Sequence, residues 1–146
     1  MQLTSPLAQI LADRKLISYV PLRTEVSAER FVFEPAAYVI QPRPSLDPRA
    51  EALAAMQCVG REAAAVLLPG RRFDASGTRH GQGGGWYDRF LARVPDHWLW
   101  IGFCYADQFS PTPLKREAWD QPMDYVCVID RETGALQMYA SGKLVA

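Results

Sequence analysis

The first quarter of the chain has a pattern of apolar and polar positions that predicts a helix, a strand and a second short helix. Residues 6–14 follow a serine–proline start signal and place three apolar side chains on one face, which favours a helix. Residues 16–20 favour a strand that ends at Pro21, because proline cannot donate to a central sheet ladder. The segment 25–34 favours a short helix that begins at Ser27.

A proline-rich connection separates this region from a second helix and a buried strand. Residues 35–48 contain four prolines and one short β-prone stretch, 38–40, so we expect a stiff connection within one domain. An Asp–Pro start signal and a closing Gly60 delimit a helix over 48–59. The uninterrupted apolar run 63–68 then predicts a strand that is buried on both faces.

The second half of the chain continues this alternation of helices and strands. We expect a helix over 86–93, a buried strand over 98–105, and a hairpin formed by residues 125–129 and 135–139. Helices that alternate with buried strands predict an α/β fold with three layers, α/β/α, and a mainly parallel sheet with an antiparallel end. The whole chain, 1–146, is expected to form a single domain.

The composition is that of a soluble globular protein. The chain has 146 residues, of which 49% are apolar, enough to bury a core without disulfides or a structural metal. Sixteen basic residues balance sixteen acidic ones, so no overall field attracts nucleic acid or an anionic membrane. Three widely spaced cysteines and the lack of a signal peptide or a membrane-spanning run favour a reducing, cytoplasmic location.

A glycine-rich segment is the first candidate for chemistry. Residues 70–85 hold six of the ten glycines and lead from a buried strand into a helix, where α/β proteins bind ligands. Four of the five positions in 81–85 are glycine, so backbone N–H groups can approach an anion beside the positive end of the helix dipole. The segment therefore predicts a phosphate site, although it fits no standard phosphate motif and a plain flexible turn also explains the glycines.

Charged and aromatic residues beside this loop favour binding of phosphate, metal and a flat ring. Arg79 can pair with phosphate oxygens, and Asp88 can hold a hard cation such as Mg²⁺. Trp86 and Tyr87 offer flat faces for a ring. Each residue also has an ordinary interpretation, as a solvated arginine, a favourable acid in the first helical turn, or core aromatics.

The loop and its flanks carry a sequence signature. Residues 66–90, VLLPGRRFDASGTRHGQGGGWYDRF, resemble the 5-formyltetrahydrofolate cyclo-ligase family (methenyltetrahydrofolate synthetases). In that family a buried strand ends in Pro-Gly, continues through a glycine-rich motif and enters a helix as Y-Y-D-R. The resemblance continues at 101–108, which includes Gln108, and in the segment 119–126, WDQPMDYV, and is fainter at 17–26.

This resemblance implies a fold, an activity and a set of residues. The fold is similar to the sugar-phosphate isomerase and CoA-transferase-like group. Family members convert 5-formyltetrahydrofolate to 5,10-methenyltetrahydrofolate with ATP and Mg²⁺, through a phosphorylated formyl oxygen that the other folate nitrogen displaces. The residues implied for ATP are Arg79, Gly81, Gln82, Gly83, Gly84, Gly85 and Trp86. Those implied for Mg²⁺ are Asp88 and Asp120, those implied for the reduced folate are Glu25 and Tyr87, and the implied catalytic residues are Arg79 and Tyr87.

Departures from the family pattern keep a second hypothesis open. The family's opening helix carries a lysine and an arginine for the phosphates, and we expect this chain to lack it, together with part of the middle region after Glu25. His80 and Trp86 stand where the family has leucine and its first tyrosine. The alternative is therefore a weakly active or inactive member that binds nucleotide or folate or serves as an interaction protein. A homo-oligomer in which a partner subunit supplies the missing cation is compatible with either hypothesis.

Overall fold

The core of the protein is a six-stranded sheet. The computed structural model describes residues 6–32, 34–41, 45–81 and 85–141. The strands of the sheet are Lys15–Tyr19 (β1), Tyr38–Ile40 (β2), Ala64–Pro69 (β3), Leu99–Tyr105 (β6), Tyr125–Ile129 (β7) and Leu136–Ala140 (β8). The strand order is β2-β1-β3-β6-β7-β8, and all neighbours are parallel except β7 and β8. The predicted parallel sheet with an antiparallel end is confirmed.

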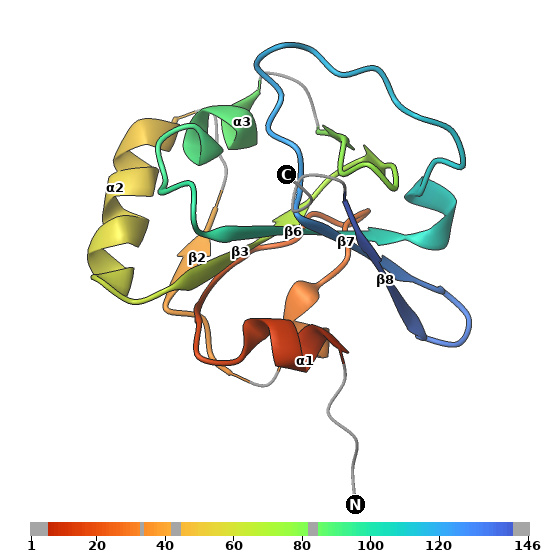
Figure 1. Cartoon of the computed structure of the whole chain (residues 1–146), viewed down its shortest axis with the longest axis horizontal. Coiled ribbons are helices and arrows are strands. Elements are labelled where there is room, and N and C mark those ends of the chain that lie inside the picture. The colour runs from red at the N-terminus through yellow and green to blue at the C-terminus, as the bar shows by residue number, and fades with distance from the viewer. Residues whose placement is uncertain (1–5, 33, 42–44, 82–84, 142–146) are drawn as a thin grey trace, which may run out of the picture.

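Helices cover both faces of this sheet. They are Pro6–Leu11 (α1), Pro48–Val59 (α2) and Trp86–Leu91 (α3), with 3-10 helices at Ala28–Phe31 (η1) and Ala106–Gln108 (η2). Figure 1 shows α2 and α3 together on one side of the sheet and α1 and η1 on the other, which confirms the three-layer architecture. Within the described ranges, no helix has the length and apolar character needed to cross a membrane.

The uninterrupted apolar runs become the central strands because both of their faces are covered. All six residues of β3 are buried, and β3 lies between β1 and β6 in the sheet. The register pairs Ala65 with Leu99 and Leu67 with Ile101. A parallel strand with helices on both faces has no solvent-facing side, so its sequence shows no polar alternation.

The second helix begins and ends where its sequence signals predict. The Asp47 side chain accepts a hydrogen bond from the Arg49 N–H at 2.9 Å, and Pro48 occupies the first helical turn. At the other end the Gly60 N–H donates to the Met56 carbonyl at 2.9 Å, and the φ of 66° at Gly60 then turns the chain out of the helix. The predicted helix over 48–59 is confirmed.

Three segments differ from the sequence-based expectation, and one of them is the third helix, which ends at Leu91 and not at residue 93. The first helix ends at Leu11 and not at residue 14, because Asp13 adopts a left-handed φ of 63° that interrupts the helix. The glycine-rich region, expected as a loop, contains a small antiparallel ribbon of Arg72–Phe73 (β4) and Arg79–His80 (β5). Strands of two residues are too short to produce a periodic pattern, which is why the ribbon was not predicted.

The Phe73 ring fixes this ribbon against the sheet. Phe73 is fully buried and packs directly on Gly102 of β6, where a Cβ atom would lie 2.2 Å from the ring. The Phe73 carbonyl also accepts a hydrogen bond from the Ser110 N–H at 2.7 Å. The absence of a side chain at position 102 therefore creates the space into which the ribbon docks.

The carboxylate of Asp74 organises the turn between β4 and β5. Asp74 is 2% exposed, and its Oδ1 accepts hydrogen bonds from the Ser76 N–H, the Ser76 hydroxyl and the Thr78 N–H at 2.7–3.0 Å. Its Oδ2 accepts a fourth bond from the Leu114 N–H at 2.7 Å. Burial favours the neutral carboxyl, but these hydrogen bonds outweigh it and hold the pKa of Asp74 below its ordinary value.

Asp74→Asn is expected to reduce the free energy of unfolding at neutral pH by about 1–3 kcal/mol, because a buried charged acceptor is lost. A carboxyl with a lowered pKa stabilises the fold above its unfolded pKa of about 3.9, and this contribution disappears as the pH falls through the folded pKa. The difference between wild type and variant should therefore shrink below about pH 4. Urea denaturation across pH tests this, with the exposed Asp96→Asn as control. A difference that stays constant with pH would refute this role.

Candidate functional site

Arg79 lies at the centre of a group of polar residues drawn from four separate segments. Its guanidinium carbon lies 4.6 Å from the centre of the Tyr87 ring. The charges of Asp88, Glu25 and Asp120 are close enough to act on the Arg79 guanidinium. The structure thus brings together the residues predicted for phosphate, metal and folate binding, although they are up to 95 positions apart in the chain.

The Arg79 side chain is buried beside the glycine loop. Its exposed fraction is 9%, and its Nε donates to the Pro69 carbonyl at 2.5 Å. A Cβ atom on Gly81 would lie 3.0 Å from both terminal nitrogens, so the guanidinium lies directly against this glycine. Burial lowers the pKa of Arg79, and Tyr87 and the nearby carboxylates oppose this effect.

The terminal nitrogens of Arg79 have no carboxylate partner in the described part of the chain. Among the residues that the structure describes, no Asp or Glu lies within 4.0 Å of this guanidinium. A buried cation without a paired anion carries a desolvation cost that a bound oxyanion would offset. Arg79 is therefore well suited to hold an anion against the backbone at Gly81.

The glycine loop itself is only partly described. Gly81 is half-buried, and Gly85 precedes the first turn of α3 with a left-handed φ of 66°. Gln82, Gly83 and Gly84, which were predicted to bind ATP, lie outside the described residues. Their predicted contacts with phosphate stay predictions.

Tyr87 contributes a buried ring and a buried hydroxyl. The side chain is 6% exposed, and its hydroxyl finds no hydrogen-bond partner within the described part of the chain. Burial raises the pKa of this phenol, the Arg79 charge lowers it and the Glu25 charge raises it further. An unsatisfied buried hydroxyl is costly, so a polar group of a bound ligand would stabilise this arrangement.

The two carboxylates predicted for metal binding are electrostatic neighbours. Burial raises the pKa of Asp88, and the Asp120 charge adds to this rise, while a hydrogen bond from Gln121 and the Arg79 charge oppose it. Asp88 Oδ1 accepts from the Gln121 N–H at 3.1 Å, and Asp120 Oδ2 accepts from the Glu117 N–H at 2.8 Å. Each carboxylate retains one oxygen without a bond to any described residue.

This donor set fits Mg²⁺ shared with a phosphate ligand. No group of three or more Asp, Glu, His or Cys side chains with metal-site geometry occurs among the described residues. Mg²⁺ in phosphoryl-transfer enzymes is usually held by only one or two carboxylates, together with water and phosphate oxygens. The pair Asp88 and Asp120 is of that kind.

Glu25 approaches the same centre from the segment after β1. It is 9% exposed, and its Oε1 accepts from the Leu22 N–H at 2.7 Å. The Tyr19 hydroxyl donates to the carbonyl of Val26, the residue that follows Glu25. The Glu25 charge raises the pKa of both Tyr19 and Tyr87. The carboxylate is thus held close to the Tyr87 phenol.

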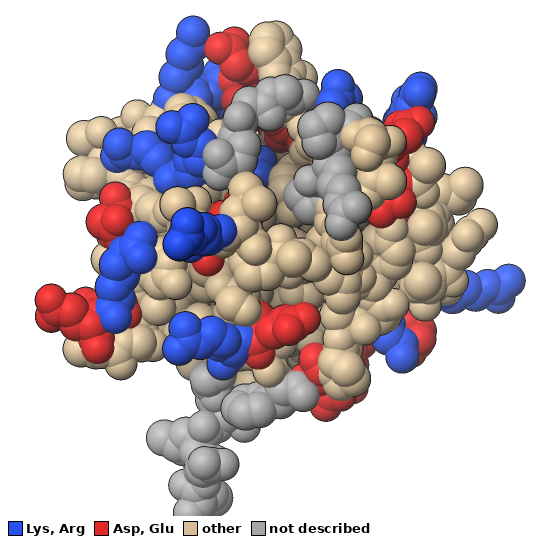
Figure 2. All heavy atoms as spheres, turned by 180° about the vertical axis from the view of Figure 1, so that it is seen from behind, with Lys and Arg blue, Asp and Glu red and all other residues tan. Residues whose placement is uncertain are grey.

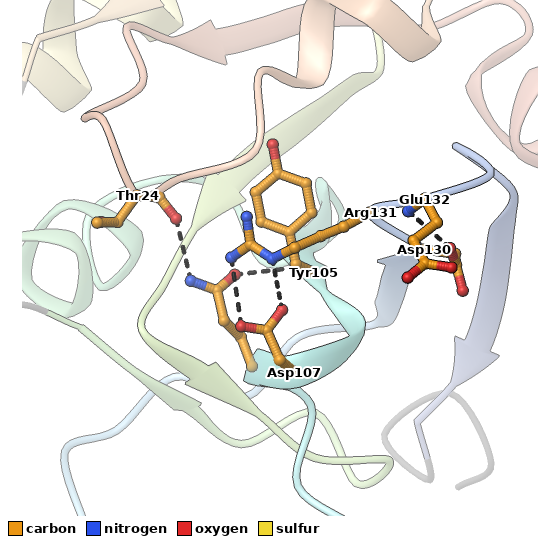
Figure 3. A network of polar contacts seen from close by, with 7 residues as sticks. Thr24, Tyr105, Asp107, Asp130, Arg131 and Glu132 are labelled. Carbon is orange, nitrogen blue, oxygen red and sulfur yellow. Dashed lines mark hydrogen bonds and ion pairs between the residues drawn. The ribbon is translucent and has the colours of Figure 1, made fainter.

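A polar network that the sequence did not predict supports the segment that carries Glu25 (Figure 3). Gln108 accepts from the Tyr105 N–H at 2.9 Å and donates to the Thr24 carbonyl at 3.0 Å, next to Glu25. The Arg131 guanidinium lies over the Tyr105 ring and pairs with Asp107 at 2.7 Å. Gln108 belonged to the sequence signature, but its contact with a residue 84 positions away left no local signal.

Trp86 and His80 form their hydrogen bonds outside the group around Arg79, although the Trp86 ring contacts the Tyr87 ring edge-on at a centroid distance of 5.3 Å. The Trp86 ring stacks on Phe90 and its Nε1 donates to the Leu46 carbonyl at 3.1 Å, so it lies between α3 and the start of α2. The His80 Nε2 donates to the Lys115 carbonyl, 2.7 Å away. Neither contact involves Arg79, and the ATP contact expected for Trp86 stays a prediction.

Exposed cations surround the ribbon that carries Arg79. Figure 2 shows Lys and Arg side chains gathered on the side of the molecule where the ribbon lies. The exposed basic residues of this region are Arg71, Arg72, Lys115 and Arg116, and Arg116 donates to Ser76 and Thr78 in the β4–β5 turn. Although the chain has no net charge, the field around this part of the protein favours the approach of anions.

Comparisons with known proteins agree with the sequence resemblance. The sequence profile of the 5-formyltetrahydrofolate cyclo-ligase family matches residues 39–129, which include β3, the glycine loop, α3, β6 and β7. No curated protein gives a significant match to the chain.

Two solved structures share the fold, and the matched family profile covers more than half of the chain. A 5,10-methenyltetrahydrofolate synthetase from Mycoplasma pneumoniae is 20% identical with a TM-score of 0.53, over 86% of this chain and 80% of that one. The 5,10-methenyltetrahydrofolate synthetase from Aquifex aeolicus is 23% identical with a TM-score of 0.59, over 92% of this chain and 75% of that one. Because the profile match includes the strand, loop and helix that hold Arg79 and Asp88, the chain belongs to the 5-formyltetrahydrofolate cyclo-ligase family.

Proposed function

We propose that this protein catalyses the ATP- and Mg²⁺-dependent cyclisation of 5-formyltetrahydrofolate to 5,10-methenyltetrahydrofolate. The observation that carries the proposal is the buried Arg79 guanidinium, which lies against Gly81 without a carboxylate partner among the described residues. Membership of the cyclo-ligase family supports the choice of substrates. The proposed small-molecule partners are ATP and a reduced folate, and the proposed location is the cytoplasm, where free thiols such as Cys58 stay reduced.

The reaction needs positioning and charge neutralisation more than a protein nucleophile. The γ-phosphoryl group of ATP passes to the formyl oxygen, which leaves ADP and an activated carbon. The second folate nitrogen attacks that carbon, the C–O bond breaks and inorganic phosphate departs. Phosphoryl transfer of this kind is accelerated mainly by cations and N–H donors that stabilise charge on the transferring group.

The residues around Arg79 supply these functions in the proposal. Arg79 neutralises phosphate charge while the glycine loop, Gly81 to Gly85 with Gln82, Gly83 and Gly84, provides N–H donors, and Trp86 completes the ATP site. Asp88 and Asp120 hold Mg²⁺, which when bound supplies further neutralisation of the phosphate oxygens. Glu25 and Tyr87 face the folate, and the unsatisfied Tyr87 hydroxyl is the group that a folate polar atom would satisfy.

A second candidate function is nucleotide or folate binding with little turnover. It is favoured by the observation that Arg79 is the only buried Lys or Arg among the described residues. Removal of a single transition-state hydrogen bond typically costs about two to three orders of magnitude in rate, so a site with few cations turns over slowly. A cation supplied by a second copy of the chain in a homo-oligomer would restore the rate.

Binding of ATP·Mg²⁺ tests the site directly. Arg79→Gln is expected to weaken binding at least about tenfold, because a charge-assisted contact with phosphate is lost. Asp88→Asn is expected to remove the dependence of binding on Mg²⁺. Isothermal titration calorimetry measures both, with the exposed Arg61→Gln as the matched control. ATP binding that is unaffected by Arg79→Gln would contradict the assignment.

Turnover distinguishes the two candidate functions. The proposed cyclisation predicts slow formation of the methenyl product from 5-formyltetrahydrofolate, ATP and Mg²⁺, because Arg79 is the only buried Lys or Arg among the described residues, whereas the second candidate predicts no product. Methenyl absorbance follows the reaction, with Asp88→Asn as the control. Rapid turnover by the wild type that is lost in Asp88→Asn would show that the cations of this chain are sufficient for fast catalysis. Nucleotide binding without turnover would favour the second candidate.

The link between Gln108 and Thr24 should hold Glu25 in place for folate. Gln108→Ala removes two hydrogen bonds, one with the Tyr105 N–H and one with the Thr24 carbonyl, and is expected to raise the exchange rates of the Leu22 and Glu25 amide hydrogens about two- to tenfold. Folate binding should weaken while ATP binding is unchanged. Hydrogen exchange followed by NMR measures the first effect, with the exposed Gln137→Ala as control. Unaltered exchange in this segment would show that Gln108 does not position it.

A further inference from the structure

A hollow between α2 and α3 lies outside the site centred on Arg79. Its volume is about 680 Å³, within the range of small-molecule sites. Its walls come from the start of α2 and from one face of α3, and none of Glu25, Arg79, Tyr87 or Asp88 is among them. The lining residues are Ser45, Leu46, Asp47, Pro48, Arg49, Trp86, Arg89, Ala92 and Arg93.

The charges that line this hollow are mainly positive. Arg49, Arg89 and Arg93 contribute three guanidinium groups, and the only carboxylate in the lining is Asp47, which pairs with Arg49 at 3.4 Å. Neither Arg89 nor Arg93 forms an ion pair with a described residue. The lining therefore has an excess of two positive charges. Arg89 in α3 and Arg93, which follows that helix, have no carboxylate within 4.0 Å among the described residues, although the pKa of Asp47, lowered mainly by hydrogen bonds from Arg49, is lowered further by the Arg89 charge.

The wall of the hollow is fixed by contacts between the two helices. The Trp86 ring stacks on Phe90 with a centroid distance of 5.7 Å, and its Nε1 donates to the Leu46 carbonyl at 3.1 Å. The Arg49 N–H donates to Asp47, so this backbone donor at the start of α2 is already occupied. The hollow thus combines an aromatic wall held by two contacts with two arginines, Arg89 and Arg93, that have no carboxylate partner among the described residues.

We propose that this hollow binds a phosphate or diphosphate group of a small molecule, as a second anion site separate from Arg79. Guanidinium groups form paired hydrogen bonds with phosphate oxygens, and three of them line this hollow with a single carboxylate, Asp47, among them. A carboxylate offers only two oxygens and one charge, which leaves part of the positive charge unmatched. The proposal goes beyond the proposed cyclo-ligase reaction. Of the described residues assigned to ATP or Mg²⁺ in that reaction, Trp86 alone is among the residues that line the hollow.

Inorganic pyrophosphate, without added metal, is the probe. Calorimetry on the full chain should show that the Arg89→Gln/Arg93→Gln double variant binds it at least about tenfold more weakly than wild type. The matched control Arg61→Gln should bind as wild type does, and Arg79→Gln should retain binding in the hollow. Both replaced arginines are exposed, and circular dichroism verifies that the double variant is folded. NMR amide shifts should map the probe to residues 45–49 and 86–93.

Two outcomes would overturn the proposal. Pyrophosphate affinity that the double variant leaves unchanged would show that the hollow does not bind the anion. A triglutamate peptide that binds the hollow as tightly as pyrophosphate would show that the site takes carboxylates. Either result leaves the cyclo-ligase proposal intact, because that proposal depends on the separate effect of Arg79→Gln on ATP·Mg²⁺.

Discussion

The burial of the Arg79 guanidinium is the constraint on which the rest of the site depends. A cation that is 9% exposed requires compensation, and the protein supplies it through the Pro69 carbonyl, the face of Tyr87 and carboxylates that act from a greater distance. These groups hold the side chain in one position without neutralising its terminal nitrogens. The remaining positive charge lies against Gly81, where a Cβ atom would be 3.0 Å from both terminal nitrogens of Arg79.

This position of Arg79 follows from packing far from the charge itself. Phe73 enters the space above Gly102 and fixes one strand of the ribbon, and the Asp74 carboxylate closes the turn that returns the chain to Arg79. The segment that carries Glu25 is held from the opposite side by Gln108. In the proposed function, stability and activity are thus connected, because a loosened ribbon or segment would move the charges that are proposed to bind an anionic substrate.

The sequence predicted the elements whose signals are local. Buried strands such as β3 have continuous apolar runs, and α2 has a cap at Asp47 and a glycine at its end, so their positions were predicted closely. The ribbon at 72–80 was missed because two-residue strands have no period, and its stability comes from the contact of Phe73 with Gly102. The arginine hollow was also missed, since it exists only where α2 and α3 meet. The family resemblance predicted the site residues, but not the contacts that hold them.

The most direct test of the central claim is a crystal structure of the protein with ADP and Mg²⁺. The account predicts a phosphate oxygen within about 3.2 Å of a terminal nitrogen of Arg79 and of the Gly81 N–H, with the metal between the phosphate and Asp88. A nucleotide whose phosphates lie elsewhere, while Arg79 stays against Tyr87 without an anion, would contradict it.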